Sequence, residues 1–190
     1  MRRWWVWALV FALGLASGAA PVRADGGWLD EKPIKPWNQA GMSVPRPLAE
    51  DAPFPANEER CAARIRQPEN AADQAVVDAG WTLYESYRAG WGISVVFATV
   101  GTDGMCRPWG YQQFVFVNGV FAGTVSPVPM YSRTDGSGSV LSLDGDGRIS
   151  ASFARYDDKD PLCCPSKPSA FVEFKIDRNE NGPLLALANQ

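Results

Sequence analysis

Apolar and polar positions follow a hairpin pattern most clearly between residues 112 and 126, QQFVFVNGVFAGTVS. Two apolar runs flank Asn118-Gly119. Asn-Gly tolerates the positive φ angles that a two-residue type I′ turn requires. The pattern therefore predicts a β-hairpin that pairs residues 112–117 with residues 120–125.

A second hairpin is predicted over residues 139–156, SVLSLDGDGRISASFARY, with its turn at residues 144–147. Side chains alternate between the two faces of a strand. One face of the return strand is apolar, with Ile149, Ala151 and Phe153. The opposite face carries Ser150, Ser152 and Ala154.

Further short elements precede and follow these hairpins. Residues 69–80 fit a short helix that Asn70 can cap and Gly80 can end. Residues 81–87 alternate, with Trp81, Leu83 and Glu85 on one face, and residues 92–100 form a β-branched run typical of a strand buried on both sides. Residues 170–176 predict a last strand that turns Val172, Phe174 and Ile176 inward.

About seven short strands at close spacing, joined by Gly and Pro turns, predict a mainly β fold. We expect an antiparallel sheet curled as a barrel or a sandwich, with one short N-terminal helix and disulfide bonds. An α+β fold is the alternative.

The chain divides into four segments. Residues 1–24 read as a secretory signal peptide, with a basic start, an apolar stretch and the small-x-small pattern Val22-Arg23-Ala24 before the cleavage point. Residues 25–60 contain six prolines and predict an extended arm or linker. Residues 61–176 predict the β-rich domain, and residues 177–190 a loosely held tail.

Charge narrows the range of partners. The whole chain carries 18 basic and 21 acidic side chains, and three of the basic ones are Arg2, Arg3 and Arg23, so the remaining chain has a net charge of −6. Such a chain lacks the basic surface expected for nucleic acid or an anionic membrane. We expect no nucleic-acid partner, and membrane contact only if the signal segment is retained.

The four cysteines, Cys61, Cys106, Cys163 and Cys164, all lie in the exported part, where an even count favours disulfides. A zinc site, a redox pair and a strained vicinal disulfide are alternatives. Side chains of adjacent residues diverge in an extended loop. We therefore predict two long-range bridges, in which Cys163 and Cys164 each pair with one of Cys61 and Cys106. No metal or cofactor is expected.

Catalysis has little support in the sequence. The chain contains no histidine, so it has no Ser-His or Cys-His nucleophile pair. Residues 156–160, YDDKD, supply acids, but a carboxylate mechanism needs two acids that face one cleft. Arg133 and Asp135 lie in a long loop that begins at Ser126. Loops on a rigid sheet commonly carry function, so both are ligand-contact candidates.

Several stretches resemble a known family. DGMCRPWGYQQFVFVNGVFAGTVSPVPMYSRTDGSGS, followed by DPLCCPS, is similar to the bacterial exported proteins grouped as LppP/LprE lipoproteins. The resemblance spans residues 60–176 and implies an envelope-associated protein without a defined biochemical activity or catalytic residues. This sequence lacks the acylated cysteine of the lipoprotein members. Arg107, Tyr111 and Met130 lie in these motifs and join the ligand-contact candidates.

Three hypotheses follow from the sequence. The leading one is a non-enzymatic binding or structural module of the cell envelope, periplasmic or secreted, whose partner is an envelope ligand or protein. The second is an enzyme that acts on an envelope polymer through loop carboxylates. The third is a thiol-redox or metal-handling protein that uses Cys163 and Cys164.

Overall fold

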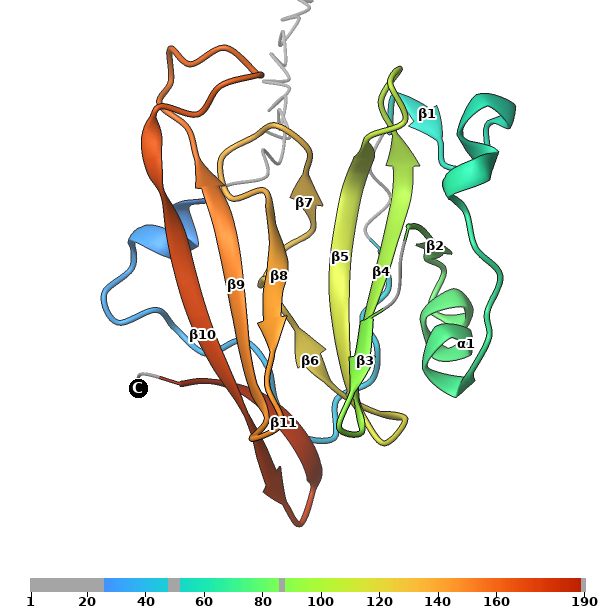
Figure 1. Ribbon diagram of the computed structural model, residues 1–190, viewed down its shortest axis with the longest axis vertical. Helices are drawn as coiled ribbons and strands as arrows, with labels where there is room; N and C mark the ends of the chain where they lie inside the picture. The colour runs from blue at the N-terminus through green and yellow to red at the C-terminus, as the bar shows by residue number, and fades with distance from the viewer. Residues whose placement is uncertain (1–25, 48–51, 86–87, 189–190) are drawn as a thin grey trace, which may run out of the picture.

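Residues 26–47, 52–85 and 88–188 are described in the computed structural model, and they form two antiparallel β-sheets that share one core (Figure 1). Within these ranges the strands do not close into a barrel. The mainly β prediction is therefore confirmed in its sandwich form. The predicted signal peptide lies outside the described residues.

The larger sheet has seven strands in the order β1-β4-β5-β6, with β2 and β3 also paired to β4 and β7 paired to β5. The long central strands are β4 (Ile93–Thr102) and β5 (Pro108–Val117). The remaining strands are short: β1 (Phe54–Pro55), β2 (Thr82–Leu83), β3 (Arg88–Gly90), β6 (Val120–Thr124) and β7 (Met130–Tyr131).

The smaller sheet has four strands in the order β11-β10-β9-β8. Their bounds are β8 (Gly138–Leu143), β9 (Arg148–Arg155), β10 (Lys167–Asn179) and β11 (Gly182–Leu187). The helices are α1 (Ala71–Asp78) and two short 3-10 helices, η1 (Gly26–Asp30) and η2 (Glu59–Arg64).

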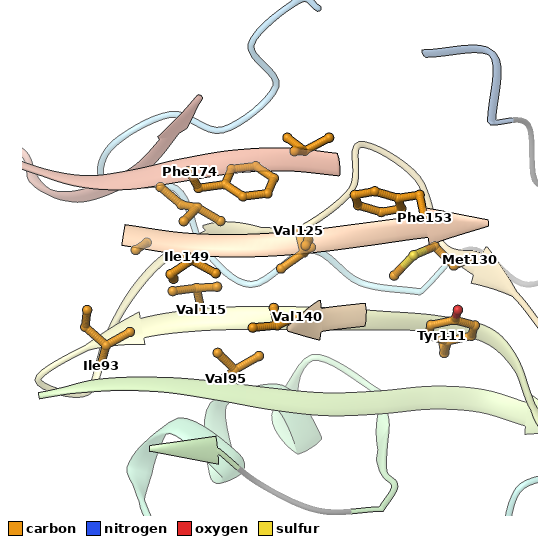
Figure 2. Close-up of a cluster of buried hydrophobic side chains, with 14 of the residues drawn as sticks. Ile93, Val95, Tyr111, Val115, Val125, Met130, Val140, Ile149, Phe153 and Phe174 are labelled. Atoms are coloured by element: carbon orange, nitrogen blue, oxygen red, sulfur yellow. The ribbon is translucent and has the colours of Figure 1, made fainter. Parts of the chain in front are cut away.

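The core between the sheets is built from the inward faces of β4, β5, β9 and β10 (Figure 2). Val95 and Val115 lie opposite each other in the larger sheet, and Ile149, Phe153 and Phe174 meet them from the smaller one. The other face of β4 and β5 packs on α1 through a second buried cluster that includes Val76, Val96 and Phe114. This confirms the prediction that residues 92–100 are buried on both sides.

Local patterns placed most elements correctly. Val117 pairs with Val120 across a turn at Asn118 and Gly119, whose φ angles are 49° and 81°, so the first hairpin is confirmed. The second hairpin and the strand over 170–176 are also formed. Asn70 caps α1, because its side-chain oxygen accepts the N–H of Asp73 at 3.0 Å.

Two segments differ from the predictions. Of the strand expected over 81–87, the described residues form β2, and Glu85 takes a φ of 59°, which ends the extended backbone there. Residues 86–87 lie outside the described residues. The prediction of a loosely held tail was wrong for residues 182–187. They form β11, which pairs with β10 from Asn179–Gly182 to Phe174–Leu187 and buries Leu185. Its backbone groups find partners on β10, and Leu185 joins the core.

The Pro-rich arm packs on the folded domain, at least over residues 26–47. Trp28 meets Phe153 edge to face with ring centroids 5.0 Å apart, and Trp37 meets Phe174 at 5.9 Å. Asn38 is buried and joins the two sheets: its amide donates to the carbonyls of Thr124 on β6 and Leu185 on β11, at 3.0 and 3.1 Å. The arm is therefore a structural part of the sandwich.

Candidate functional site

A cleft of about 530 Å³ opens where the edge strand β8 meets the β4–β5 face of the larger sheet. The larger sheet and the turn before β5 contribute Phe97, Arg107 and Tyr111. The smaller sheet and the loop before it contribute Arg133, Ser137, Ser139, Leu141 and Ser152. Two grooves beside the arm, where it crosses β10 and β11, are smaller, at about 240 and 220 Å³.

Arg107 is positioned by the turn that precedes β5. The Asp103 carboxylate accepts the N–H groups of Met105 and Arg107 at 2.8 and 3.0 Å, and it also accepts the Arg107 Nε–H. Cys106 has a φ of 58° and is held in place by its disulfide to Cys61. The turn thus delivers the guanidinium to the cleft on a fixed backbone.

The same turn leaves part of the Arg107 guanidinium unused. Burial alone would raise the pKa of Asp103, but the N–H groups of Arg107 and Met105, together with the guanidinium, bring that pKa below its ordinary value. Asp103 therefore remains a carboxylate that orients Arg107. The Nη1 atom of Arg107 is buried and has no hydrogen-bond partner among the described residues. That atom lies inside the protein and is not exposed in the cleft.

Tyr111 forms the floor of the cleft and links the sheets. Its ring stacks on Phe97 with centroids 5.1 Å apart and planes 17° apart. Its hydroxyl donates to the Gly138 carbonyl at 3.2 Å and accepts the Gly138 N–H at 3.0 Å. Burial raises the pKa of Tyr111 well above its ordinary value. The hydroxyl therefore keeps its proton and serves to hold β8 against β5.

Arg133 lies on the opposite rim. It is exposed, has a φ of 65°, and makes no hydrogen bond or ion pair within the described part of the chain. Its neighbours fix the loop: the hydroxyls of Ser132 and Thr134 donate to the carbonyls of Pro108 and Tyr131 at 2.7 and 2.8 Å. Glu85, another non-glycine residue with positive φ, also lines the cleft. Such outliers are enriched at functional sites.

The structure thus brings together three of the five candidates: Arg107, Tyr111 and Arg133. Met130 is buried in the core, and Asp135 faces Arg155, whose Nε donates to it at 2.9 Å. Arg155 also reaches Asp30 of η1 with both Nη atoms, at 3.0 and 2.8 Å. Met130 and Asp135 therefore support the loop and do not line the cleft.

Sequence reasoning missed the serines and Phe97. Ser139 on β8 and Ser152 on β9 are cross-strand partners, and both line the cleft. The alternation of residues 148–155 had placed Ser152 on the polar face. It held no signal that Ser152 would line the same cleft as Phe97 and Tyr111, because the cleft joins segments far apart in the sequence.

The predicted cysteine connectivity was wrong. Cys61 pairs with Cys106, and Cys163 pairs with its neighbour Cys164. η2 places Cys61 beside the turn that holds Cys106, with Cα atoms 5.3 Å apart, within the usual range for a disulfide. Cys163 and Cys164 lie in an exposed loop instead.

That loop is closed by Asp160, which accepts the N–H groups of Asp157 and Ser166 at 2.7 and 2.8 Å. These two N–H groups lower the pKa of Asp160. The Tyr156 hydroxyl donates to the Leu162 carbonyl at 3.2 Å, and the Tyr156 side chain also lines the cleft. The acids of residues 156–160 therefore do not face each other across the cleft.

Glu85 is the acidic side chain among the residues that line the cleft, and it is paired with Arg64 at 2.8 Å. In the described part of the chain, no group of three His, Cys, Asp or Glu side chains is arranged to hold a metal ion. Nor do the described helices include one that is long and apolar enough to cross a membrane.

Comparison with known protein families identifies the family of this chain. The family model of the LppP/LprE lipoproteins matches residues 85–179, which include the cleft strands and the Cys163–Cys164 loop. The chain belongs to the LppP/LprE lipoprotein family, a group of envelope-associated proteins of undefined function. Searches of curated proteins and of solved structures find no match.

Proposed function

We propose that this protein is a non-enzymatic binding module of the cell envelope, periplasmic or secreted, and that the cleft between β8 and the β4–β5 face is its ligand site. The observation that carries the proposal is an open polar cleft lined by Arg133 and by four serine side chains, none of which makes a hydrogen bond or ion pair among the described residues. Such accessible donors and acceptors are available to a ligand.

The arrangement favours binding over the hydrolytic alternative. Carboxylate catalysis needs two acids on opposite sides of the reacting bond. Glu85 is paired with Arg64, Asp103 is bonded to Arg107 and backbone, and Asp160 is bonded to its own loop. Each of these carboxylates has a structural partner and no second acid across the cleft.

The proposal is tested with the purified protein, both disulfides intact, and fractionated bacterial envelopes. Polysaccharide, peptidoglycan and lipid-vesicle fractions are immobilised, and retention of the protein is measured on each. A Ser139→Trp variant fills the cleft from the exposed edge of β8. The matched control is Ser43→Trp, which adds the same side chain at an exposed serine of the arm away from the cleft.

We expect retention on at least one fraction, loss of that retention in Ser139→Trp and no change in Ser43→Trp. Retention that survives Ser139→Trp would contradict the cleft as the ligand site. Circular dichroism and thermal unfolding of both variants verify that a loss does not come from misfolding.

A second candidate function rests on the exposed Cys163–Cys164 disulfide. In this alternative, two thiols at 163 and 164 would transfer two electrons and two protons to a substrate disulfide, closing the Cys163–Cys164 bond and releasing two substrate thiols. Incubation of the reduced protein with glutathione disulfide tests it. Formation of two glutathione molecules per protein as the Cys163–Cys164 bond closes, absent in a Cys163→Ser/Cys164→Ser variant, would favour the redox function over the binding module.

A further inference from the structure

One guanidinium group with free donors lines the cleft. Arg133 has neither a hydrogen bond nor an ion pair among the described residues, whereas Arg107 is paired with Asp103 and its Nη1 atom is buried. Guanidinium groups recognise carboxylates and phosphates through paired N–H donors. The cleft therefore has cationic donors available for one anionic group.

Among the described residues, no carboxylate is paired with Arg133. Glu85 is paired with Arg64, and Asp103 is paired with Arg107, so neither of these acids offsets the charge of Arg133. The cleft is consequently a local cationic site on a chain whose sequence is acidic overall. This contrast favours an anionic ligand small enough to be recognised locally.

Serine hydroxyl groups line the same cleft as Arg133. The side chains of four lining serines, Ser137, Ser139, Ser152 and Ser169, make no hydrogen bond with the described residues. A serine hydroxyl both donates and accepts. Ser139 and Ser152 are direct neighbours across β8 and β9, so their hydroxyls form a pair at the spacing of adjacent strands. Such a set matches a ligand that carries several hydroxyl groups of its own.

An aromatic platform completes the site. Phe97 is half-buried in the cleft and stacks on the buried Tyr111, which is fixed by Gly138. The face of an aromatic ring carries partial negative charge. The C–H bonds on the apolar face of a sugar ring pack favourably against such a surface. The exposed Leu141 adds a second apolar contact at the wall.

From this combination we propose that the cleft binds an anionic saccharide, with its carboxylate or phosphate on Arg133, its ring on Phe97 and its hydroxyls on the serines of β8 and β9. The inference rests on the proposed binding function and specifies its ligand class. A carboxylate and a phosphate could each supply the negative charge of the ligand, and the experiment distinguishes the two groups.

The test measures binding to the protein with both disulfides intact by isothermal titration calorimetry. Three probes are compared: a galacturonic acid trimer, a galactose trimer of the same length, and glucose 1-phosphate. We expect the trimer of galacturonic acid or the sugar phosphate to bind, and the neutral trimer to bind at least about tenfold more weakly, because it lacks the charge-assisted hydrogen bonds. Raising the salt concentration should weaken the anionic probes selectively.

Arg133→Gln is the informative variant, because Arg133 is exposed and has no structural partner to lose. We expect it to reduce the affinity for the anionic probe about 10-fold to 100-fold and to leave the neutral trimer unchanged. The matched control is Arg148→Gln. It removes one positive charge from an exposed arginine paired with Asp146 at the turn between β8 and β9, and it should leave both affinities unchanged.

Equal affinity for the neutral and anionic trimers, or no effect of Arg133→Gln, would overturn the anionic-saccharide inference. The inference would also be overturned if no saccharide probe binds and the protein instead binds phosphatidylglycerol vesicles in a manner that depends on Arg133. In that case the protein could still be retained on an envelope fraction and lose this retention in Ser139→Trp. That result would support the binding function although the anionic-saccharide inference had failed, so the two proposals are tested separately.

Discussion

The Tyr111 hydroxyl donates a hydrogen bond to the Gly138 carbonyl and accepts one from the Gly138 N–H, at 3.2 and 3.0 Å. Tyr111 belongs to β5 of the larger sheet, and Gly138 begins β8 of the smaller one. A single side chain thus satisfies both backbone groups of one residue on the facing edge. A similar link follows at Gln113, whose Oε1 accepts the Val140 N–H at 2.9 Å. These contacts fix the edge along which the cleft opens.

Tyr111→Phe should lower the free energy of unfolding by about 1–3 kcal/mol, because it leaves the Gly138 N–H and carbonyl unpaired near the core. Urea unfolding at neutral pH measures the change. Tyr156→Phe is the control: it removes a hydroxyl that donates to the Leu162 carbonyl in an exposed loop, and it should cost less than about 1 kcal/mol. Equal effects of the two variants would contradict the linking role of Tyr111.

Alanine substitutions at Gly119 and Gly123 distinguish the cost of backbone strain from the cost of a steric clash with the arm. Both have positive φ, 81° and 149°, so an alanine is strained at either position. A Cβ at Gly119 would meet nothing within 4 Å, whereas a Cβ at Gly123 would lie 2.4 Å from Asn38 Cγ. Gly119→Ala should cost about 1 kcal/mol and leave the arm in place. Gly123→Ala should cost more and displace Asn38.

The effect of Gly119→Ala and Gly123→Ala on the arm is measured by hydrogen–deuterium exchange of residues 26–47. Faster exchange of the arm in Gly123→Ala alone is the expected outcome. If the arm exchanges equally in both variants and in the unaltered protein, Asn38 does not join the arm to β6 and β11.

The two disulfides should differ in their effect on stability. Cys61 and Cys106 are 45 positions apart, and in the chain-entropy model such a bridge is worth about 4 kcal/mol. Cys61→Ala/Cys106→Ala should lose about this amount. Cys163→Ser/Cys164→Ser should change unfolding by less than about 1 kcal/mol, because a bond between adjacent residues closes almost no loop. Peptide mapping without reduction checks the connectivity, and a Cys61–Cys163 or Cys61–Cys164 peptide would refute it.

Stability should fall in acid partly through Asp73. Burial alone would raise the pKa of Asp73, but hydrogen bonds from Arg66 and from the Glu69 N–H hold that pKa below its ordinary value. A lowered pKa in the folded state contributes stability above the unfolded pKa of about 3.9, and the contribution is lost as the pH falls through the folded pKa.

Asp73→Asn should therefore cost about 3–5 kcal/mol at pH 7, since it leaves the largely buried Arg66 without its carboxylate. The difference in the free energy of unfolding between Asp73→Asn and the unaltered protein should become smaller below about pH 4. Denaturant unfolding at several pH values measures it. Asp78→Asn, at an exposed carboxylate of the same helix, is the control and should cost less than about 1 kcal/mol at pH 7.

We predict that export of the chain produces a mature N-terminus at Asp25, because Val22-Arg23-Ala24 matches the small-x-small pattern before a signal-peptidase site. Intact-mass measurement of protein from the periplasm or the medium checks the site. A full-length mass recovered from the membrane fraction would instead indicate a retained anchor.

Local interactions explain which features could be predicted. The turn at Asn118-Gly119, the cap at Asn70 and the alternation of Ile149, Ala151 and Phe153 each depend on residues within a few positions of one another. Their conformations follow from backbone preferences and side-chain period, so the sequence alone predicts them. The family could also be recognised, because its motifs are short and contiguous.

The candidate site depended on contacts that no local pattern contains. The motifs pointed to Arg107, Tyr111 and Arg133, but their meeting in one cleft required β8 to lie against β5, and Ser139 and Ser152 came with β8 and β9. The cysteine pairing went wrong for the same reason: the bridge from Cys61 depends on where η2 lies beside the turn at Cys106. The sequence by itself determined the two hairpins, the capped helix and the family. The packing of distant segments, which buries apolar surface from different parts of the chain, decided the disulfide pairing, the strand β11, the docking of the arm and the cleft.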